Sequence, residues 1–260
     1  MKIATFNING IKARLHRLTS WLEAAQPDVA LLQEIKSVDE AFPRGPIEDL
    51  GYRVETHGQK GFNGVAILSK LEIDDISRGL PGDEDDEQAR WIEAIVIGTV
   101  PVRLACLYLP NGNPAPGPKY DYKLAWMERM ERHARRLLSQ EMPLVLAGDY
   151  NVIPQPEDAR RPEAWTEDAL FRPESRAAFR RLLNLGLTDA IRAKQPAGPG
   201  PFTFWDYQAG AWQRDDGIRI DHLLLSPQAA DLMRDAGADR AERDREKPSD
   251  HVPVWVDLDA

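Results

Sequence analysis

The stretch Pro143-Leu144-Val145-Leu146-Ala147-Gly148-Asp149-Tyr150-Asn151 decides the fold and the chemistry of this chain. An apolar run ends abruptly in a carboxylate, Asp149, and a carboxamide, Asn151. The pattern predicts a buried strand over Leu144–Ala147 that carries both polar groups at its C-terminal end. Such rigid placement suits a site that positions a metal ion or a reacting phosphate. Gly-Asp after a strand is by itself more often a plain turn. The interpretation therefore depends on the other strand ends.

Composition limits the classes of protein. The 260 residues are 42% hydrophobic and 29% charged, as in a globular protein, and we expect one domain over residues 1–260. No apolar run approaches the roughly 20 residues that span a bilayer, so no membrane partner is expected. The net charge of -9 argues against a broad, sequence-independent nucleic-acid binder. It leaves open an enzyme that meets phosphate through a divalent metal and a local basic patch.

The cysteine count and the N-terminal residues bear on location. The single cysteine, Cys106, lies in an apolar run and cannot form an internal disulfide, which suits a reducing cytoplasm. Residues 1–6 pass straight into a strand pattern without the apolar core of a signal peptide. We therefore expect a cytoplasmic, monomeric protein without an N-terminal targeting extension.

Hydrophobic patterning predicts many strands and fewer helices. The predicted strands are Ile3–Phe6, Val29–Gln33, Arg53–Thr56, Val65–Ser69, Ile92–Ile97, Val102–Tyr108, Leu144–Ala147, Ile218–Leu225 and Val252–Val256. The predicted helices are Ile11–Ala25, Lys119–Gln140, Ser175–Leu185 and Pro227–Asp235. Neighbouring strands suggest hairpins, so the pattern favours an α+β fold with two mixed sheets packed face to face and helices outside, a four-layer α/β/β/α sandwich. Strand, helix, strand occurs once per half, which suggests two similar halves.

Polar residues lie at the ends of five of the predicted strands, four after the strand and one before it. They are Asn7-Ile8-Asn9-Gly10, Gln33-Glu34, Tyr108-Leu109-Pro110-Asn111-Gly112, Gly148-Asp149-Tyr150-Asn151 and, before the last strand, Ser249-Asp250-His251. Each alone reads as a turn or a surface pair, but a set of polar strand ends is how such scaffolds build sites. Carboxylate and amide oxygens are hard ligands suited to Mg²⁺ or Mn²⁺, whereas zinc calls for Cys or several His. Phosphate-loop and serine-hydrolase motifs are absent from the sequence.

Together these residues resemble the exonuclease III family of apurinic/apyrimidinic endonucleases, in its bacterial form, within the endonuclease/exonuclease/phosphatase superfamily. The resemblance covers essentially the whole chain. The strand-end motifs carry it, together with His57-Gly58-Gln59-Lys60-Gly61, Phe202-Thr203-Phe204-Trp205-Asp206-Tyr207 and Gly217-Ile218-Arg219-Ile220-Asp221. It implies a Mg²⁺-dependent nuclease, with Mn²⁺ as an alternative and one or two ions. Such an enzyme cuts duplex DNA 5′ to abasic sites and processes 3′ ends as a 3′ to 5′ exonuclease and 3′ phosphatase or phosphodiesterase.

The resemblance also implies roles for residues. Glu34 would be the main metal ligand with Asn7 and Asp250 close by, and Asp149, Asn151 and His251 would add ligands or hold the phosphate. Asp149 would handle the attacking water, Asp221 would orient His251, and Tyr108 would stabilise developing charge beside Asn111. The residues expected to form a pocket for a sugar without its base are Phe204, Trp205, Ile218 and Ile220. The expected DNA-backbone contacts are Lys36, Gln59, Lys60, Arg90 and Lys119, with Asn111 also facing DNA.

Two alternatives stay open from the sequence. A phosphatase of the same fold, acting on small or lipid phosphoesters, is favoured by the acidic net charge. A non-catalytic binding protein with this fold is disfavoured by the complete set of polar strand ends. Departures from the family pattern, such as Ile218 where some relatives carry Trp, leave open the balance between endonuclease and exonuclease activity.

Overall fold

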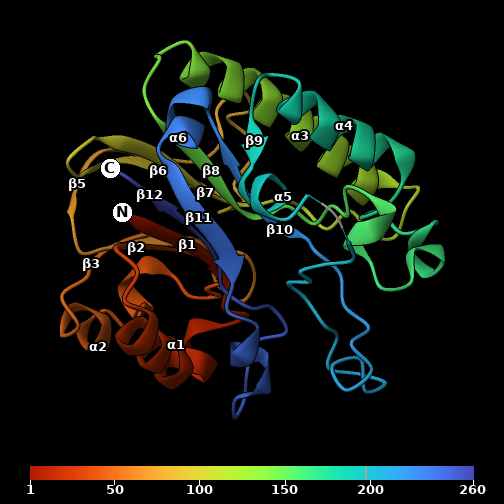
Figure 1. The fold of residues 1–260 in the computed structure, drawn as a ribbon, viewed down its shortest axis with the longest axis horizontal. Helices are drawn as coiled ribbons and strands as arrows, with labels where there is room; N and C mark the ends of the chain where they lie inside the picture. The colour runs from red at the N-terminus through yellow and green to blue at the C-terminus, as the bar shows by residue number, and fades with distance from the viewer. Residues whose placement is uncertain (197) are drawn as a thin grey trace.

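The computed structural model describes residues 1–196 and 198–260 and contains two six-stranded sheets packed face to face (Figure 1). The first sheet has the order β11 (Met233–Ala238), β12 (Val254–Leu258), β1 (Lys2–Asn7), β2 (Val29–Gln33), β4 (Val65–Ser69), β3 (Arg53–His57). The second has the order β5 (Glu72–Arg78), β6 (Trp91–Ile97), β7 (Val102–Tyr108), β8 (Leu144–Asp149), β10 (Asp221–Leu225), β9 (Thr188–Asp189). Both sheets are mixed, as the sequence predicts.

Each sheet contains the same kind of topological unit, two parallel strands connected by a helix. In the first sheet β1 lies parallel to β2, and helix α1 (Ile11–Ala25) connects them. In the second sheet β7 lies parallel to β8, and helix α3 (Pro118–Leu138) connects them. The other strand pairs are antiparallel. Each half of the chain therefore brings the C-terminal ends of two parallel strands to one edge of its sheet, the usual place for a site.

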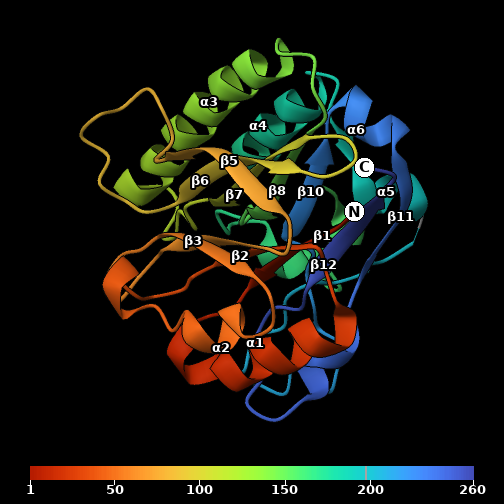
Figure 2. The same ribbon diagram turned by 90° about the vertical axis from the view of Figure 1, so that its left-hand side faces the viewer.

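Three apolar layers hold the sandwich together. Alternate residues of β1 face opposite ways, so Ile3 packs between the sheets and Phe6 packs beneath α1 against Trp21. The outer face of the second sheet packs against α3 and helix α4 (Pro173–Leu183). Figure 2 shows α1 and α2 (Gly45–Glu48) on one side of the paired sheets and α3 and α4 on the other. The four-layer sandwich is confirmed, and burial of both sheet faces explains the continuous apolar runs.

Several predicted elements need correction. The helix predicted over Pro227–Asp235 ends early as α6 (Pro227–Asp231), and the next residues form edge strand β11 because they pair with β12. The strand predicted from Ile218 begins at Asp221, since Ile218 makes only isolated bridges. Strand β5 was not predicted. The other short elements are α5 (Ala190–Lys194) and the 3-10 turns η1 (Asp39–Ala41), η2 (Pro156–Asp158), η3 (Pro162–Trp165) and η4 (Arg240–Asp244).

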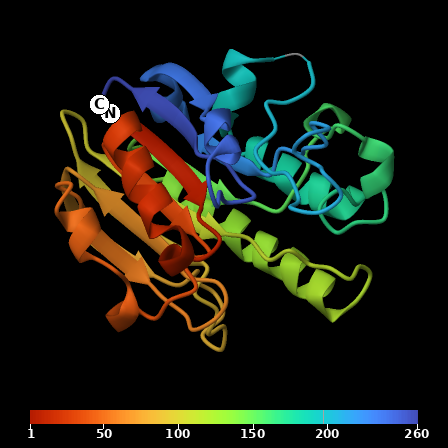
Figure 3. The same cartoon turned by 90° about the horizontal axis from the view of Figure 1, so that it is seen from below.

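The loops that build the site lie together at one end of the sandwich. The green loops that follow β8 and the cyan-to-blue loops that precede β10 lie away from the two chain ends in Figure 3. Among the described residues, no helix has both the length and the apolar character that crossing a membrane requires.

Candidate active site

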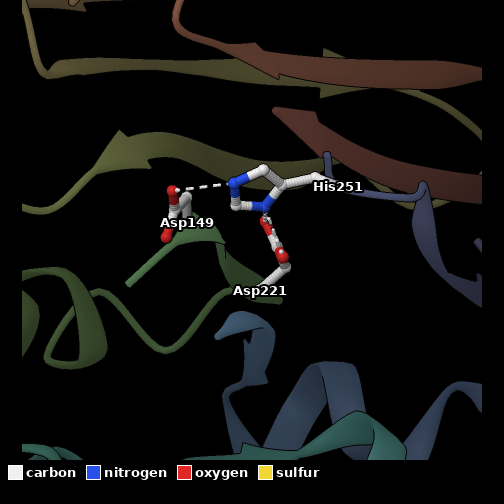
Figure 4. A group of neighbouring side chains, drawn as sticks. All are labelled: Asp149, Asp221 and His251. Carbon is white, nitrogen blue, oxygen red and sulfur yellow. Dashed lines mark hydrogen bonds and ion pairs between the residues drawn. The ribbon is translucent and has the colours of Figure 1, made fainter. Parts of the chain in front are cut away.

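Two buried aspartates flank the imidazole of His251 (Figure 4). Asp149 ends β8, Asp221 begins β10, and the two pair directly across the sheet. The carboxylate of Asp221 lies 2.9 Å from His251 Nδ1, and Asp149 Oδ2 lies 3.8 Å from Nε2. Burial by itself lowers the pKa of His251, but the charge and hydrogen bond of Asp221, together with Asp149, raise it to about 10. His251 is therefore an imidazolium that points Nε2–H toward Asp149.

Asp149 is the carboxylate whose ionisation the site perturbs most. Its side chain is buried, and burial is the main reason that its pKa rises to about 7. The charge of His251 opposes this rise, while Asp221 and Glu34 add to it. The backbone N–H of Asn151 donates to Asp149 Oδ1 over 2.9 Å. A carboxylate with a pKa near neutrality can both take and release a proton at working pH.

Asn7 connects the two halves of the site. Its amide nitrogen donates to Glu34 Oε1 and to Asp149 Oδ2, each over 3.0 Å. The Tyr108 hydroxyl donates to the same Glu34 oxygen over 2.8 Å, and Lys36 Nζ lies 2.8 Å from the other. Burial raises the pKa of Glu34, but the hydrogen bonds from Asn7 and Lys36 outweigh it and hold the pKa below its usual value. Glu34 is therefore an anion beside Asp149.

A buried lysine supports the loops from below. Lys123 of α3 is fully buried, and its Nζ donates to the backbone carbonyls of Asn111 over 3.0 Å and Asn151 over 2.6 Å. Asn111 Nδ2 in turn donates to Asn151 Oδ1 over 3.2 Å. Burial lowers the pKa of Lys123 to about 7. Lys123 thus ties together the loops that follow the parallel strands β7 and β8.

The donor set fits a divalent cation. Asp149, Asp221 and His251 have ligand atoms within 4.8 Å of one another, so this buried cluster could hold a metal ion that displaces the proton of His251. A second group of oxygens surrounds the Lys36 ammonium, which contacts Glu34 and Asn9 Oδ1, while Asn9 Nδ2 donates to Asp250. These oxygens hold the ammonium cation of Lys36. Carboxylate and amide oxygens are also the ligands that Mg²⁺ and Mn²⁺ prefer.

A cavity of about 320 Å³ opens beside these groups. Phe204 forms one wall and stacks edge-on against His251, with ring centroids 5.0 Å apart. Trp165, Leu170 and Ile220 add apolar surface. The predicted site residues that line the cavity are Glu34, Tyr108, Asn111, Asp149, Asn151, Phe204, Ile220, Asp250 and His251. Asn7 and Asp221 lie directly behind, bonded to members of this set.

Two residues predicted for the pocket lie elsewhere. Trp205 is fully buried and packs with Phe202 and Val252, away from the cavity lining. The reason is alternation, since consecutive side chains of an extended segment point to opposite sides and Phe204 takes the cavity side. Ile218 is also buried; it packs behind Phe204 and bridges to its backbone.

The residues predicted to contact the DNA backbone lie outside the cavity lining, in different settings. Lys36 pairs with Glu34, and Arg90 lies over the Tyr108 ring at 4.8 Å. Gln59 is bound inside its own loop by Asn63 and Ala89. Lys60 and Lys119 are exposed.

Sequence reasoning missed Trp165, Asp168 and Lys123. The first two come from an irregular loop without a strand-end signal. Lys123 carried a usable signal, because it interrupts the apolar face of a helix between Tyr120 and Trp126. A lysine in such a place is buried only when it has partners.

Known proteins share this architecture. Residues 4–251 match the profile of the Endonuclease/Exonuclease/phosphatase family. The chain belongs to this family. Exodeoxyribonuclease III of Haemophilus influenzae is 37% identical over 270 residues, which cover 99% of this chain and 100% of that protein. An AP endonuclease structure from Archaeoglobus fulgidus superposes with a TM-score of 0.95 at 37% identity, covering 100% of both chains.

A third relative in the Endonuclease/Exonuclease/phosphatase family is a 3′ phosphatase from Neisseria, NExo, solved with a product DNA hairpin. It is 38% identical, with a TM-score of 0.95 and full coverage of both chains. On the strength of these homologues, the chain is a DNA-repair nuclease and therefore a hydrolase. The predicted resemblance is confirmed, and metal dependence is typical of the family.

Proposed function

We propose that this protein is a Mg²⁺-dependent nuclease that cuts duplex DNA 5′ to abasic sites and processes DNA 3′ ends. The observation that carries the proposal is that Asp149, imidazolium His251 and Tyr108 lie together at a small, mostly polar cavity with apolar surface at Phe204 and Ile220. A sugar without its base fits such a cavity, whereas a base-bearing nucleotide in a duplex would first have to be extruded. The activities named for the relatives, exodeoxyribonuclease, AP endonuclease and 3′ phosphatase, agree with this substrate class.

The proposed mechanism assigns proton handling to Asp149. A water that attacks phosphorus must lose a proton, and Asp149 is the carboxylate whose pKa, about 7, matches that task. His251, held as an imidazolium in one orientation by Asp221, donates Nε2–H to a phosphate oxygen and balances its charge. Asn151, anchored to Leu109 O and Asp149, fixes the phosphate from the other side.

Tyr108 and the oxygen ligands complete the proposed site. The pKa of the Tyr108 hydroxyl is raised well above its usual value, first by burial and then by Glu34 and Asp149, so it is a neutral donor toward developing negative charge. Glu34 and Asp250, with Asn7 behind them, would hold the divalent ion, and Asp149 and Asn151 are the candidates for a second, since protonated His251 has no free lone pair. The ion, when bound, neutralises phosphate charge and lowers the pKa of water.

The test uses a duplex with a single abasic site, in Mg²⁺, in Mn²⁺ and in EDTA. We expect a cut 5′ to the site with either metal and none in EDTA. A second substrate with a 3′-phosphate at a nick measures end processing. Hydrolysis of small phosphomonoesters without DNA cleavage would instead establish the phosphatase alternative, which the acidic net charge favours.

We further propose that residues 1–260 act as a single monomeric domain in a reducing cytoplasm. Both sheets contribute to the same apolar layer, which supports one cooperative unit. The only cysteine, Cys106, is buried, and burial raises its pKa to about 12, so it stays an inert thiol. A single mass at the monomer value in light scattering would agree with this, and a dimer mass would contradict it.

A further inference from the structure

One aromatic ring is exposed without a structural use. Phe62 is 76% exposed, the highest value among the large hydrophobic side chains that the structure describes as exposed. An exposed ring of this size gains nothing from the core, and neither the cavity nor the catalytic groups involve it. Phe62 follows Lys60 and Gly61 in the loop between β3 and β4.

The loop that carries Phe62 is rigid. Asn63 Nδ2 donates to Gln59 Oε1 over 2.8 Å and closes the turn, and the Ala89 N–H donates to the same Gln59 oxygen over 3.1 Å. The loop lies flush on its neighbour, because a Cβ at Gly64 would lie 2.5 Å from Ile35 Cγ1. The backbone that carries Phe62 is thus braced by its neighbours, so less backbone freedom remains to be lost on binding.

The loop is fastened to the active-site strand ends. Lys36 N donates to Asn63 O over 3.0 Å, and Ile35 N donates to Gly64 O over 3.1 Å, so both residues after Glu34 are paired with it. On its other side Gly64 N donates to Ala89 O, next to Arg90. Basic residues therefore border this loop: Lys36, which also pairs with Glu34, lies on one side, Arg90 lies on the other, and Lys60 lies in the loop itself.

We propose that Phe62 stacks on a nucleobase flanking the cleaved phosphodiester. This inference rests on the proposed nuclease function and adds a contact that reads the base rather than the backbone. Lysine and arginine side chains bind phosphates, and an exposed aromatic ring can stack on the flat face of any base. A protein partner is less suited, because a single ring among lysines and arginine lacks the apolar core of a protein interface.

The experiment compares Phe62→Ala, Phe62→Leu and Phe62→Trp on the abasic duplex. Leucine keeps apolar surface but removes the flat ring, whereas tryptophan keeps the ring. We expect KM to rise about tenfold for the alanine and leucine variants with kcat unchanged, and the tryptophan variant to match the wild type. Ile97→Ala, which trims a partly exposed apolar residue at the end of β6, is the matched control.

Salt separates stacking from charge. Lys60→Ala should flatten the dependence of KM on salt, whereas Phe62→Ala should raise KM equally at every salt concentration. Wild-type KM in Phe62→Ala, or full recovery in Phe62→Leu, overturns the stacking contact while leaving the nuclease function intact. Failure of the wild type itself to cut the duplex overturns both.

Discussion

The parallel strand–helix–strand unit of each sheet gives the site one carboxylate and one nearby lysine, in opposite surroundings. Glu34 and Lys36 form an ion pair whose side chains are 19% and 32% exposed. Asp149 and Lys123 are both buried, and Lys123 binds backbone carbonyls instead of the carboxylate. The pKa of Glu34 is lowered, while that of Asp149 rises to about 7. The same kind of unit thus holds Glu34 as an anion in the first sheet and Asp149 as a carboxylate that can exchange a proton in the second.

The largest expected effect breaks the unit of the second sheet. Asp149→Asn keeps the size of the side chain but cannot accept a proton from water, so kcat should fall by about 10³-fold. Single-turnover cleavage of the abasic duplex measures it, and circular dichroism checks the fold. Asp28→Asn, which alters a carboxylate bonded to the Lys2 backbone at the far end of β1, serves as control. Cleavage by Asp149→Asn at the wild-type rate would remove Asp149 from the water-handling role.

The corresponding change in the unit of the first sheet should act through metal. Glu34→Gln keeps an acceptor for Asn7 and Tyr108 but removes the negative charge, so apparent Mg²⁺ affinity should fall by about 10- to 100-fold. Activity titrated against Mg²⁺ should recover largely at high metal, unlike that of Asp149→Asn. An unchanged titration curve would show that Glu34 is not the main ligand.

Lys123→Met tests the buried lysine. Losing the support of the Asn111 and Asn151 carbonyls should lower kcat/KM by about tenfold. The folded pKa of Lys123, about 7, lies below its ordinary 10.5, so the unfolded chain binds more protons between these values. Wild-type stability relative to the variant should therefore rise as pH increases from about 7 to about 10.5.

Denaturant unfolding of wild type and Lys123→Met at several pH values measures this difference. Leu124→Met, the next residue on α3, controls for methionine in the helix. A stability difference that stays flat with pH would mean that Lys123 keeps its ordinary pKa in the folded protein.

The smallest effect belongs to Lys36, the partly exposed lysine of the first sheet. Lys36→Met removes a positive charge that competes with metal for Glu34, so half-saturating Mg²⁺ should fall by about two- to fivefold, the range of a partly exposed ion pair. The KM for DNA should rise slightly, because a cation near the phosphates is lost. Lys70→Met, on the far side of the first sheet, should change neither value. A higher Mg²⁺ requirement in Lys36→Met would contradict competition.

The sequence predicted those parts of the fold that depend on burial alone. Strands β2, β4 and β7 have the predicted bounds because both of their faces are covered and every residue is apolar or paired. Strand β5 was missed, since its burial comes from one neighbour at a sheet edge and its sequence, Glu72–Arg78, is largely charged. The first three residues of strand β11, Met233–Asp235, were predicted as helix because only pairing with β12 makes them extended.

Prediction of the site followed the same division. Residues at the ends of predicted strands, such as Asp149, meet because the topology brings those ends together. The sequence could not show whether Phe204 or Trp205 faces the cavity, because neighbouring side chains of an extended segment point to opposite sides. Trp165 and Asp168 depend on the path of an irregular loop, which short-range patterns do not encode.

The amide of Asn7 gives each proton on its nitrogen a different carboxylate, Glu34 for one and Asp149 for the other. These acceptors belong to different sheets and titrate in different pH ranges. In a nuclear magnetic resonance spectrum the paired signals of this one NH₂ group would therefore respond unequally, one shifting as pH passes about 7 and its twin staying still. The two amide protons of this single side chain would show, without any substrate, whether Asn7 still contacts Glu34 and Asp149 at the same time.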